Sequence, residues 1–354
     1  MRAFVTGGTG FLGANLIEQL KADGWEVIAM HRPGSNVARL RELGATPVAA
    51  SLDDIDSLRA ALPKDLDAVF HLAGNTSMWR GGDAQQWQDN VVGSANLARA
   101  AREHFAAQLA GGGAPGRMIV TSSISAYGYQ QGVLSEESPQ CANDPKYHYH
   151  YSKMHAENAV REEIAKGLDA VFLNPCGIVG KYDVSSWAQT FFMLAENTLP
   201  GVPPGGGSFC YAGAVARAHI RAFERGRCGQ NYILGGTDAS FLEFFGIIAR
   251  LVGVPAPTRT TPAFAIRAIA ALSGLVSRFT GREPAVTPQK AAMLTRRTAA
   301  DSSLAQRELG YGTELSLEEM LRESRDWLVS EGLLRLPDAS AEAAVRSEAE
   351  RKAS

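Results

Sequence analysis

The first thirteen residues limit the possible folds more than any other stretch of the chain. Residues 3–5 are a short apolar run typical of a buried β-strand. Gly7, Gly10 and Gly13 follow at the spacing G-x-x-G-x-x-G, and residues 14–21 have the pattern of an amphipathic helix. A strand, a tight glycine turn and a helix N-terminus together place free N–H groups and partial positive charge at one point, which favours a bound pyrophosphate. A glycine-rich turn without a ligand is the alternative, and the strand–helix context disfavours it.

The composition is that of an ordinary soluble globular protein. The chain has 354 residues, of which 45% are hydrophobic and 20% charged, so one large domain or two coupled domains are expected. The net charge of −2 gives no reason to expect nucleic acid or an anionic membrane as a partner. The four cysteines lack metal-ligand spacing and no signal peptide is recognisable, so we expect no metal site and a cytoplasmic location.

Residues 263–279 come closest to a membrane-spanning segment. Arg267 and Arg278 interrupt this apolar run, so we expect no integral membrane segment. A helix of a smaller lobe is the favoured interpretation, and a helix lying on a membrane surface is the alternative.

Strand and helix patterns alternate through the first half of the chain. This alternation predicts an α/β fold with a doubly wound, Rossmann-type parallel sheet. Beyond residue 180 the pattern becomes mostly helical, which predicts a smaller C-terminal substrate lobe. The predicted organisation is a nucleotide-binding domain at residues 1–180, to which 208–236 return, a substrate-binding lobe at 181–207 and 237–336, and a flexible tail at 337–354.

Tyr149 and Lys153 form a Y-x-x-x-K pair, one turn apart on a predicted helix at residues 149–166. A tyrosine has a pKa near 10, and a neighbouring ammonium group favours its ionised form. Such a pair suits proton exchange with a carbonyl or an alcohol. The pair alone is weak evidence, but it follows the predicted strand that ends in Thr121-Ser122-Ser123.

Several motifs together resemble one family. They are T-G-G-T-G-F-L-G at 6–13, F-H-L-A-G at 70–74, D-N-V-V-G-S at 89–94, T-S-S-I-S-A-Y-G at 121–128, Y-H-Y-S-K at 149–153, N-P-C-G-I-V-G at 174–180, V-A-R-A-H-I at 215–220 and A-Q-R-E-L-G-Y at 305–311. The chain resembles the extended short-chain dehydrogenases/reductases over residues 1–334. That group includes dihydroflavonol reductases, 3β-hydroxysteroid dehydrogenases and nucleotide-sugar epimerases.

The resemblance implies a set of catalytic and cofactor-binding residues. Tyr149 would be the general acid/base, Lys153 would bind the nicotinamide ribose and lower the tyrosine's pKa, and Ser123 would hold the substrate oxygen. Ser122 is the alternative serine. The implied cofactor contacts are Gly7, Thr9, Gly10, Phe11, Leu12, Gly13, Arg32, Arg39, Ser51, Leu52, Leu72, Ala73, Gly74, Thr121, Tyr149, Lys153, Pro175, Gly177 and Ile178.

The second predicted strand ends without an acidic residue that could accept the ribose 2′-hydroxyl of NAD. Arg32 stands there instead, and Arg39 follows nearby, which favours the 2′-phosphate of NADP(H). A solvated surface arginine is the alternative interpretation of Arg32. NADP is therefore the expected cofactor, with NAD less favoured.

Departures from the family narrow the expected reaction. Ile124 and Ser125 occupy the place of the acidic pair of sugar-nucleotide dehydratases, and Gly177 replaces the asparagine typical of galactose-type epimerases. Apolar and aromatic residues are present instead, and the candidate substrate contacts are Met78, Trp79, Trp187 and Phe191, with Ser123. Phe192, on the same helix, is as well explained by packing in the core.

These observations predict an NADP(H)-dependent oxidoreductase that reduces a hydrophobic or aromatic ketone or aldehyde. The alternatives are an NAD-dependent epimerase or isomerase of a sugar or sugar nucleotide, and a non-catalytic nucleotide sensor. A homodimer is plausible for this family.

Overall fold

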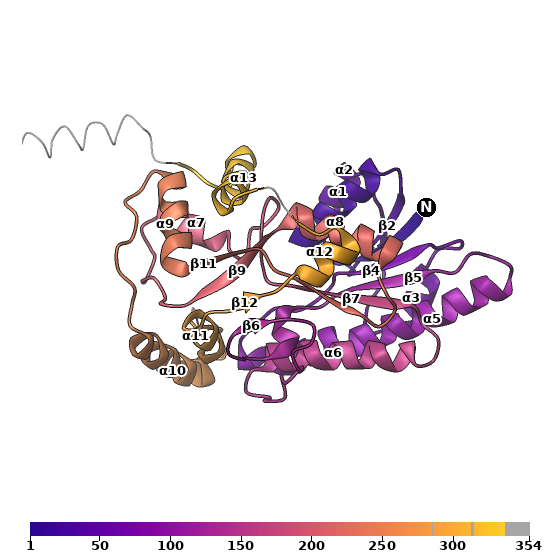
Figure 1. Ribbon diagram of the computed structural model, residues 1–354, viewed down its shortest axis with the longest axis horizontal. Coiled ribbons are helices and arrows are strands. Elements are labelled where there is room, and N and C mark those ends of the chain that lie inside the picture. Colours follow the sequence, from indigo (N-terminus) through magenta and orange to yellow (C-terminus); the bar gives the residue numbers. More distant parts are fainter. Residues whose placement is uncertain (285, 313–314, 337–354) are drawn as a thin grey trace, which may run out of the picture.

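The computed structural model describes residues 1–284, 286–312 and 315–336. The tail predicted at 337–354 lies outside the described residues. Most of the chain surrounds one large sheet, and a smaller lobe covers one end of it (Figure 1).

Seven parallel strands form the main sheet in the order β10-β7-β5-β4-β1-β2-β3. The order reverses between β1 and β4, which is the point where doubly wound sheets bind their ligands. The predicted α/β, Rossmann-type fold is thus confirmed. The strands are β1 (Arg2–Thr6), β2 (Glu26–His31), β3 (Thr46–Ala49), β4 (Ala68–His71), β5 (Arg117–Thr121), β7 (Ala170–Pro175) and β10 (Asn231–Leu234).

Helices cover both faces of this sheet, so its strands are apolar on both sides. One face packs on α1 (Phe11–Ala22), α2 (Ala38–Glu42), α8 (Ala212–Arg225) and α12 (Ser303–Leu309). The other face packs on α3 (Ile55–Ala61), α5 (Gly93–Ala110) and α6 (His148–Ile164).

The helical stretch over residues 83–110 is divided into three segments. It begins as α4 (Asp83–Trp87), widens into a π-helical segment η2 (Gln88–Val92) and continues as α5. Single π-turns are rare in proteins, and those that occur are often found at functional sites. This one places Asn90 toward the ends of the strands.

The smaller lobe contains more strand than the sequence predicted. A second sheet has the order β11-β9-β8, with β8 (Gly177–Val179), β9 (Gly206–Tyr211) and β11 (Thr237–Ser240). Within residues 208–236, β10 is a strand of the main sheet and α8 packs on that sheet, whereas β9 belongs to this second sheet. A separate apolar core lies beneath it, formed with α7 (Gln189–Ala195), α9 (Phe241–Val252) and α13 (Leu317–Ser330).

Two further helices lie at the outer edge of the lobe, α10 (Ala263–Thr280) and α11 (Pro288–Leu294), at the lower left of Figure 1. Short segments complete the fold: η1 (Arg80–Gly82), η3 (Ile124–Tyr127), β6 (Val133–Leu134) and β12 (Ala299–Ala300), of which the last two pair in parallel.

The turn between β1 and α1 has room only for glycine at two positions. A Cβ atom added to Gly13 would lie 2.2 Å from the Gly7 carbonyl oxygen. Gly7 itself has φ +73°, and a Cβ there would lie 2.5 Å from the Ala73 nitrogen. The turn is therefore pressed against the backbone that follows β4.

We predict that Gly13→Ala lowers the free energy of unfolding by about 2–4 kcal/mol, because backbone atoms must move to admit the methyl group. Urea unfolding of the two proteins measures this. Gly312→Ala is the matched control, since among the described residues no atom beyond its chain neighbours lies within 4 Å of its added Cβ. Equal unfolding midpoints for Gly13→Ala and the wild type would contradict the predicted clash.

Candidate active site

The predicted functional residues gather at the carboxyl edge of the main sheet. Parallel strands end at the same edge, so the segments after β1, β4, β5 and β7 meet there. These segments contain, in chain order, residues 7–13, 72–74, 121–123 and 175–178. The sheet thus brings four distant parts of the sequence together.

The glycine turn fits a pyrophosphate. Gly10 is the N-cap of α1 and has no side chain to occupy the free amides, and the first turn of α1, which contains Phe11 and Leu12, has no acidic residue. Thr9 is exposed beside it, and Gly7 lies against the backbone of Leu72 and Ala73. The turn therefore offers unpaired N–H groups and a close backbone approach to an anion.

A buried chain of hydrogen bonds fixes this turn to the neighbouring elements. Thr6 Oγ1 lies 2.8 Å from His71 Nδ1 and accepts a bond from the Ala73 amide. His71 Nε2 lies 2.9 Å from Ser94 Oγ, which donates its own proton to the Asn90 carbonyl oxygen. Because Ser94 has donated its only proton, His71 donates through Nε2 and accepts from Thr6 through Nδ1. Burial lowers the pKa of His71 to about 3, with a contribution from Lys153, so the ring is neutral.

Lys153 is buried at the end of β5. Its Nζ donates a 2.9 Å hydrogen bond to the Thr121 carbonyl oxygen. Thr121 Oγ1 in turn bonds His219 Nε2 at 2.7 Å, which connects the predicted V-A-R-A-H-I segment to the site. Burial lowers the pKa of Lys153 to about 8, although the Glu157 carboxylate acts in the opposite direction.

Tyr149 and Ser123 meet beside this lysine. Burial raises the pKa of Tyr149, and its hydrogen bond with Ser123 opposes the rise. Ser123 Oγ also accepts from the Ser125 amide at 3.1 Å as the N-cap of η3. The Oγ of Ser122 is buried and has no hydrogen-bond partner among the described residues. Tyr149 thus interacts with Ser123, and the choice of Ser123 over Ser122 as the catalytic serine stays a prediction. That Lys153 lowers the pKa of Tyr149 stays a prediction.

Asn90 lies in the D-N-V-V-G-S motif and supports the site through buried hydrogen bonds, a role that its motif did not predict. Its Nδ2 donates to Ser152 Oγ and to the Asn75 carbonyl oxygen, and its Oδ1 accepts from the Asn75 amide at 2.7 Å. Asn90 therefore ties the loop after β4 to the catalytic helix α6. The D-N-V-V-G-S motif was the available signal.

A second buried group that sequence reasoning missed surrounds Glu157. Its carboxylate accepts bonds from the side-chain amides of Asn174, Gln140 and Asn231, at 2.7–2.8 Å. Asn174 also donates to the Ser123 carbonyl oxygen. Glu157 therefore links α6 to the backbone that carries the serine. No motif signalled it, because its partners are distant in sequence.

The two predicted 2′-phosphate arginines differ in their surroundings. Arg32 is exposed, and no ion-pair partner for its guanidinium is found among residues 1–284, 286–312 and 315–336. Arg39 instead forms ion pairs with Glu331 and Glu42 and lies over the Tyr182 ring. Ser51 and Leu52 lie after β3 near the start of α5, where Leu52 accepts a bond from Asn96. Arg32 is thus the arginine available to an anion.

The predicted substrate contacts lie in two places, the core of the smaller lobe and the loop after β4. Phe191 is 1% exposed and packs inside the core of the lobe, so the structure gives it a packing role, and its contact with a substrate stays a prediction. Trp187 packs edge-on against Phe209 and Phe244, and its indole nitrogen lies 3.2 Å from the position of a Cβ on Gly177. Pro175 ends β7, and Gly177 and Ile178 begin β8.

Met78 and Trp79 lie in the loop after β4, both half-buried. Trp79 Nε1 donates a 2.9 Å bond to Ser277 Oγ on α10, and the Trp79 ring lies directly over Gly81. The loop that begins with Gly74, near Lys153 Nζ, therefore ends against the outer lobe. Met78 and Trp79 remain candidates for substrate contact.

The chain matches the model of the NAD dependent epimerase/dehydratase family over residues 3–235. It is 28% identical to a Synechocystis sp. protein named as a dihydroflavonol 4-reductase, over 94% of this chain and 96% of the relative. It is 31% identical to the sterol demethylase protein B of Methylococcus capsulatus, over 88% and 93%. A third relative is the 4-hydroxy-2-methyl-3-oxo-4-farnesyl-3,4-dihydroquinoline-1-oxide ketoreductase of Stigmatella aurantiaca, at 28% over 91% and 95%.

Solved structures share the fold over almost the whole chain. The crystal structure of gox2253 is 28% identical, with a TM-score of 0.80 over 94% of this chain and 99% of the other. The UDP-glucose 4-epimerase of Bifidobacterium longum, solved with NAD+ and UDP, has a TM-score of 0.72 at 20% identity, over 94% and 99%. Together with the family model and the curated relatives, this confirms the resemblance to extended short-chain dehydrogenases/reductases.

We predict that Lys153→Met stabilises the protein at pH 7 by about 1–2 kcal/mol. The pKa of Lys153 falls from 10.5 to about 8 on folding, so burying its charge costs roughly 3 kcal/mol of folding free energy. Methionine removes this cost but also loses the bond to Thr121, which contributes about 1 kcal/mol. This cost is fully present below pH 8, and wild-type stability rises as pH increases from 8 to 10.5 because only the unfolded chain stays protonated. The variant lacks that rise.

Urea unfolding at pH 7 and pH 10 measures both effects. Lys146→Met is the control, because this lysine is exposed and solvent screens its ion pair with Asp144. A Lys153→Met protein less stable than the wild type at pH 7 would show that the bond to Thr121 outweighs the burial of the charge.

Proposed function

Because the chain belongs to the NAD dependent epimerase/dehydratase family, an extended short-chain dehydrogenase/reductase group, we propose that this NAD(P)-dependent oxidoreductase is a carbonyl reductase. It uses NADPH and reduces a hydrophobic ketone or aldehyde to the alcohol, reversibly. The observation that carries the proposal is the set of Ser123, Tyr149 and Lys153, assembled beside the glycine turn at the edge of the sheet.

The glycine turn and the α1 N-terminus would hold the pyrophosphate, and Lys153 the nicotinamide ribose. When bound, the dinucleotide supplies or accepts a hydride at the substrate carbon. The protein's own groups manage the oxygen of that carbonyl. Ser123 Oγ would donate a hydrogen bond to it and fix its position.

Tyr149 transfers the proton in this proposal. Its pKa is raised by burial, so the hydroxyl is protonated at neutral pH and can donate to the oxygen as negative charge develops there. A lysine whose pKa is near 8 lies one helical turn away and can supply positive charge when protonated. In the reverse direction this charge favours the tyrosinate that accepts the alcohol proton.

Two observations support NADPH over NADH. Arg32 stands at the end of β2 with an exposed guanidinium, and the end of that strand offers no carboxylate to the ribose hydroxyls. Arg39 is paired with Glu331, so we assign the 2′-phosphate to Arg32 alone and no longer to both arginines.

A hydrophobic substrate is supported by the residues that line the substrate side. Met78 is apolar and Trp79 is aromatic. Both are half-buried in the loop after β4, which begins at Gly74 near Lys153 Nζ. Gly177 lies where epimerases of sugar nucleotides carry a polar anchor. The names of two relatives, a sterol demethylase protein and a ketoreductase of a farnesylated quinoline oxide, point to lipophilic substrates as well.

An NAD-dependent epimerase is the second candidate, because solved epimerases share this fold. An epimerase would retain its dinucleotide through purification and show no net NADPH consumption. A nucleotide sensor without catalysis would bind NADPH but turn over none of the carbonyl compounds.

We predict that Tyr149→Phe lowers kcat for NADPH-dependent ketone reduction by a factor of about 10²–10⁴, because the proton donor is lost. KM for NADPH should change little, since the hydroxyl does not bind the pyrophosphate. Absorbance of NADPH across a panel of aromatic and aliphatic ketones measures both. Tyr151→Phe is the control; its ring stacks on Trp87 and should leave kcat unchanged. Undiminished kcat in Tyr149→Phe would refute the proton-transfer role.

We predict that Arg32→Ala raises KM for NADPH by roughly tenfold to a hundredfold, the range expected when a charge-assisted hydrogen bond is lost. KM for NADH should stay the same, because NADH has no 2′-phosphate. Steady-state kinetics with each cofactor gives the ratio. Arg41→Ala, an exposed arginine on α2, is the control. A parallel rise in both KM values would mean that Arg32 does not read the 2′-phosphate.

A further inference from the structure

The outer face of α10 exposes large apolar side chains to solvent. Phe264 is 75% exposed and Phe279 is 85% exposed, at opposite ends of the helix. Between them the exposed apolar residues are Ile269, Leu272, Leu275 and Val276. Within the described residues, α10 is the one helix long and apolar enough to cross a membrane by length and composition. Such a face on a folded protein marks a contact surface.

The six side chains lie on one side of the helix. At about 100° per residue they fall within an arc of roughly 140°. The opposite side packs on the lobe through Ala270 and Ser277, which are buried, and through Gly274, which lies against Pro288 of α11. Because one side is attached to the protein, α10 can rest on a membrane surface but not cross the bilayer as it stands.

The charges at the border of this face are positive. Arg267 and Arg278 are exposed on one flank of the helix, which itself contains no acidic residue. Arg259 and Arg282 are exposed just before and after it. Glu283 is the nearby acid, and it is paired with Lys290. This surface therefore has local positive charge, although the whole chain carries −2.

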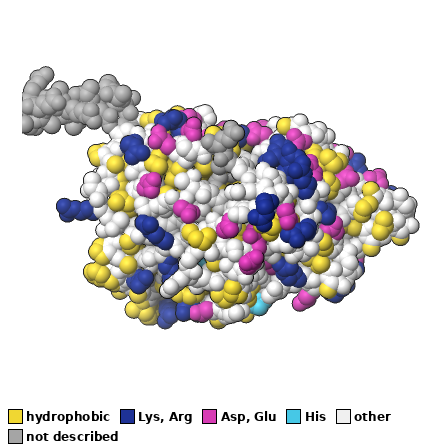
Figure 2. Space-filling model, viewed as in Figure 1, with side chains coloured by type: hydrophobic (Ala, Val, Ile, Leu, Met, Phe, Trp, Pro, Cys, Tyr) yellow, Lys and Arg dark blue, Asp and Glu magenta, His cyan; other side chains and the backbone are white. Residues whose placement is uncertain are grey.

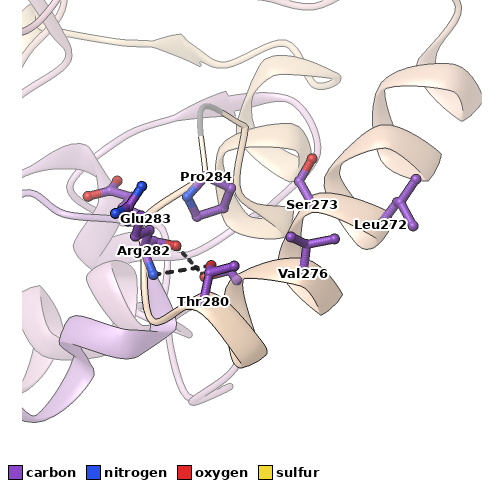
Figure 3. A pocket seen from close by; sticks show the side chains of 8 residues that line it. Leu272, Ser273, Val276, Thr280, Arg282, Glu283 and Pro284 are labelled. Atoms are coloured by element: carbon purple, nitrogen blue, oxygen red, sulfur yellow. Dashed lines mark hydrogen bonds between the residues drawn. The ribbon is translucent and has the colours of Figure 1, made fainter.

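A shallow hollow of about 380 Å³ continues the apolar face (Figure 3). Leu272 and Val276 line one wall, and Arg282 and Pro284 lie opposite. In the space-filling view, hydrophobic and basic side chains lie together at the lower left, where Figure 1 shows α10. The surface offers apolar side chains for acyl chains and guanidinium groups for phosphates.

We propose that α10 rests in the plane of an anionic lipid bilayer, with its apolar face in the acyl region and its arginines at the headgroups. A second copy of the chain is a poorer partner. One face of an 18-residue helix is about 27 Å long and about 10 Å wide, roughly 300 Å², whereas a standard interface buries about 800 Å² per partner.

This position would bring the candidate active site to the membrane. Ser277, on the inner side of α10, accepts the bond from Trp79, whose loop leads back to Lys153. The adjacent α11 places Gln289 Nε2 at 3.5 Å from His150, the neighbour of Tyr149. A lipophilic carbonyl compound dissolved in the bilayer would then reach the catalytic residues from the side of the lobe. The docking itself does not depend on the proposed reaction.

Co-sedimentation with vesicles tests the proposal, using phosphatidylcholine alone and phosphatidylcholine with about one third phosphatidylglycerol. The wild type should bind the anionic vesicles and release as salt increases. Leu272→Ser/Phe279→Ser should lower the bound fraction roughly tenfold. Leu109→Ser/Val133→Ser, which changes residues on α5 and β6 that are 58% and 62% exposed, should not lower it. Arg267→Gln/Arg278→Gln should remove the preference for phosphatidylglycerol.

Thermal unfolding checks that the exposed substitutions leave the fold intact. The proposal is overturned if the wild type binds neither kind of vesicle, or if Leu272→Ser/Phe279→Ser binds as well as the wild type. A dimer in light scattering that dissociates in this variant, without vesicle binding, would overturn it too and assign the face to a second copy. Because sedimentation is measured without turnover, a failed reductase assay and a failed docking assay are distinguishable.

Discussion

The contact between two backbone turns determines the geometry of this molecule. The turn after β1 lies so close to the turn after β4 that a methyl group at Gly7 would overlap the Ala73 nitrogen. The Thr6 hydroxyl bonds both the Ala73 amide and His71, and so holds these turns in register. Because the glycine turn and the loop after β4 begin on opposite sides of this contact, a shift there would move both at once.

The catalytic helix is held at the same edge by buried polar groups. Burial of Lys153 destabilises the positive charge of its ammonium group and so lowers its pKa. Glu157 compensates in part, since its carboxylate lies one turn further along α6 and is itself satisfied by three amide side chains. The network therefore does two things. It orients the backbone of Ser123 through Asn174, and it provides the negative charge that favours protonated Lys153.

Local patterns predicted the strands of the main sheet, the glycine turn and the Y-x-x-x-K pair, because each depends on residues a few positions apart. The roles of Asn90 and Glu157 depend on partners that only the fold brings near, and no local spacing reports them. Arg39 shows the same limit, since Glu331, its partner, is 292 positions away. The start of α7 at Gln189 shows it too, because Asp183 accepts bonds from the Ser185, Ser186 and Ala188 amides and holds a turn before the helix.

The two sides of the site are attached to the protein in different ways. On the cofactor side, buried hydrogen bonds and backbone contacts leave little freedom to substitute residues without changing the fold. On the substrate side, α10 and α11 connect to the catalytic elements through few polar contacts, chiefly Trp79 with Ser277 and Gln289 with His150. Under the proposed function, changes in those helices would alter which compound enters while the glycine turn and Tyr149 stay in place.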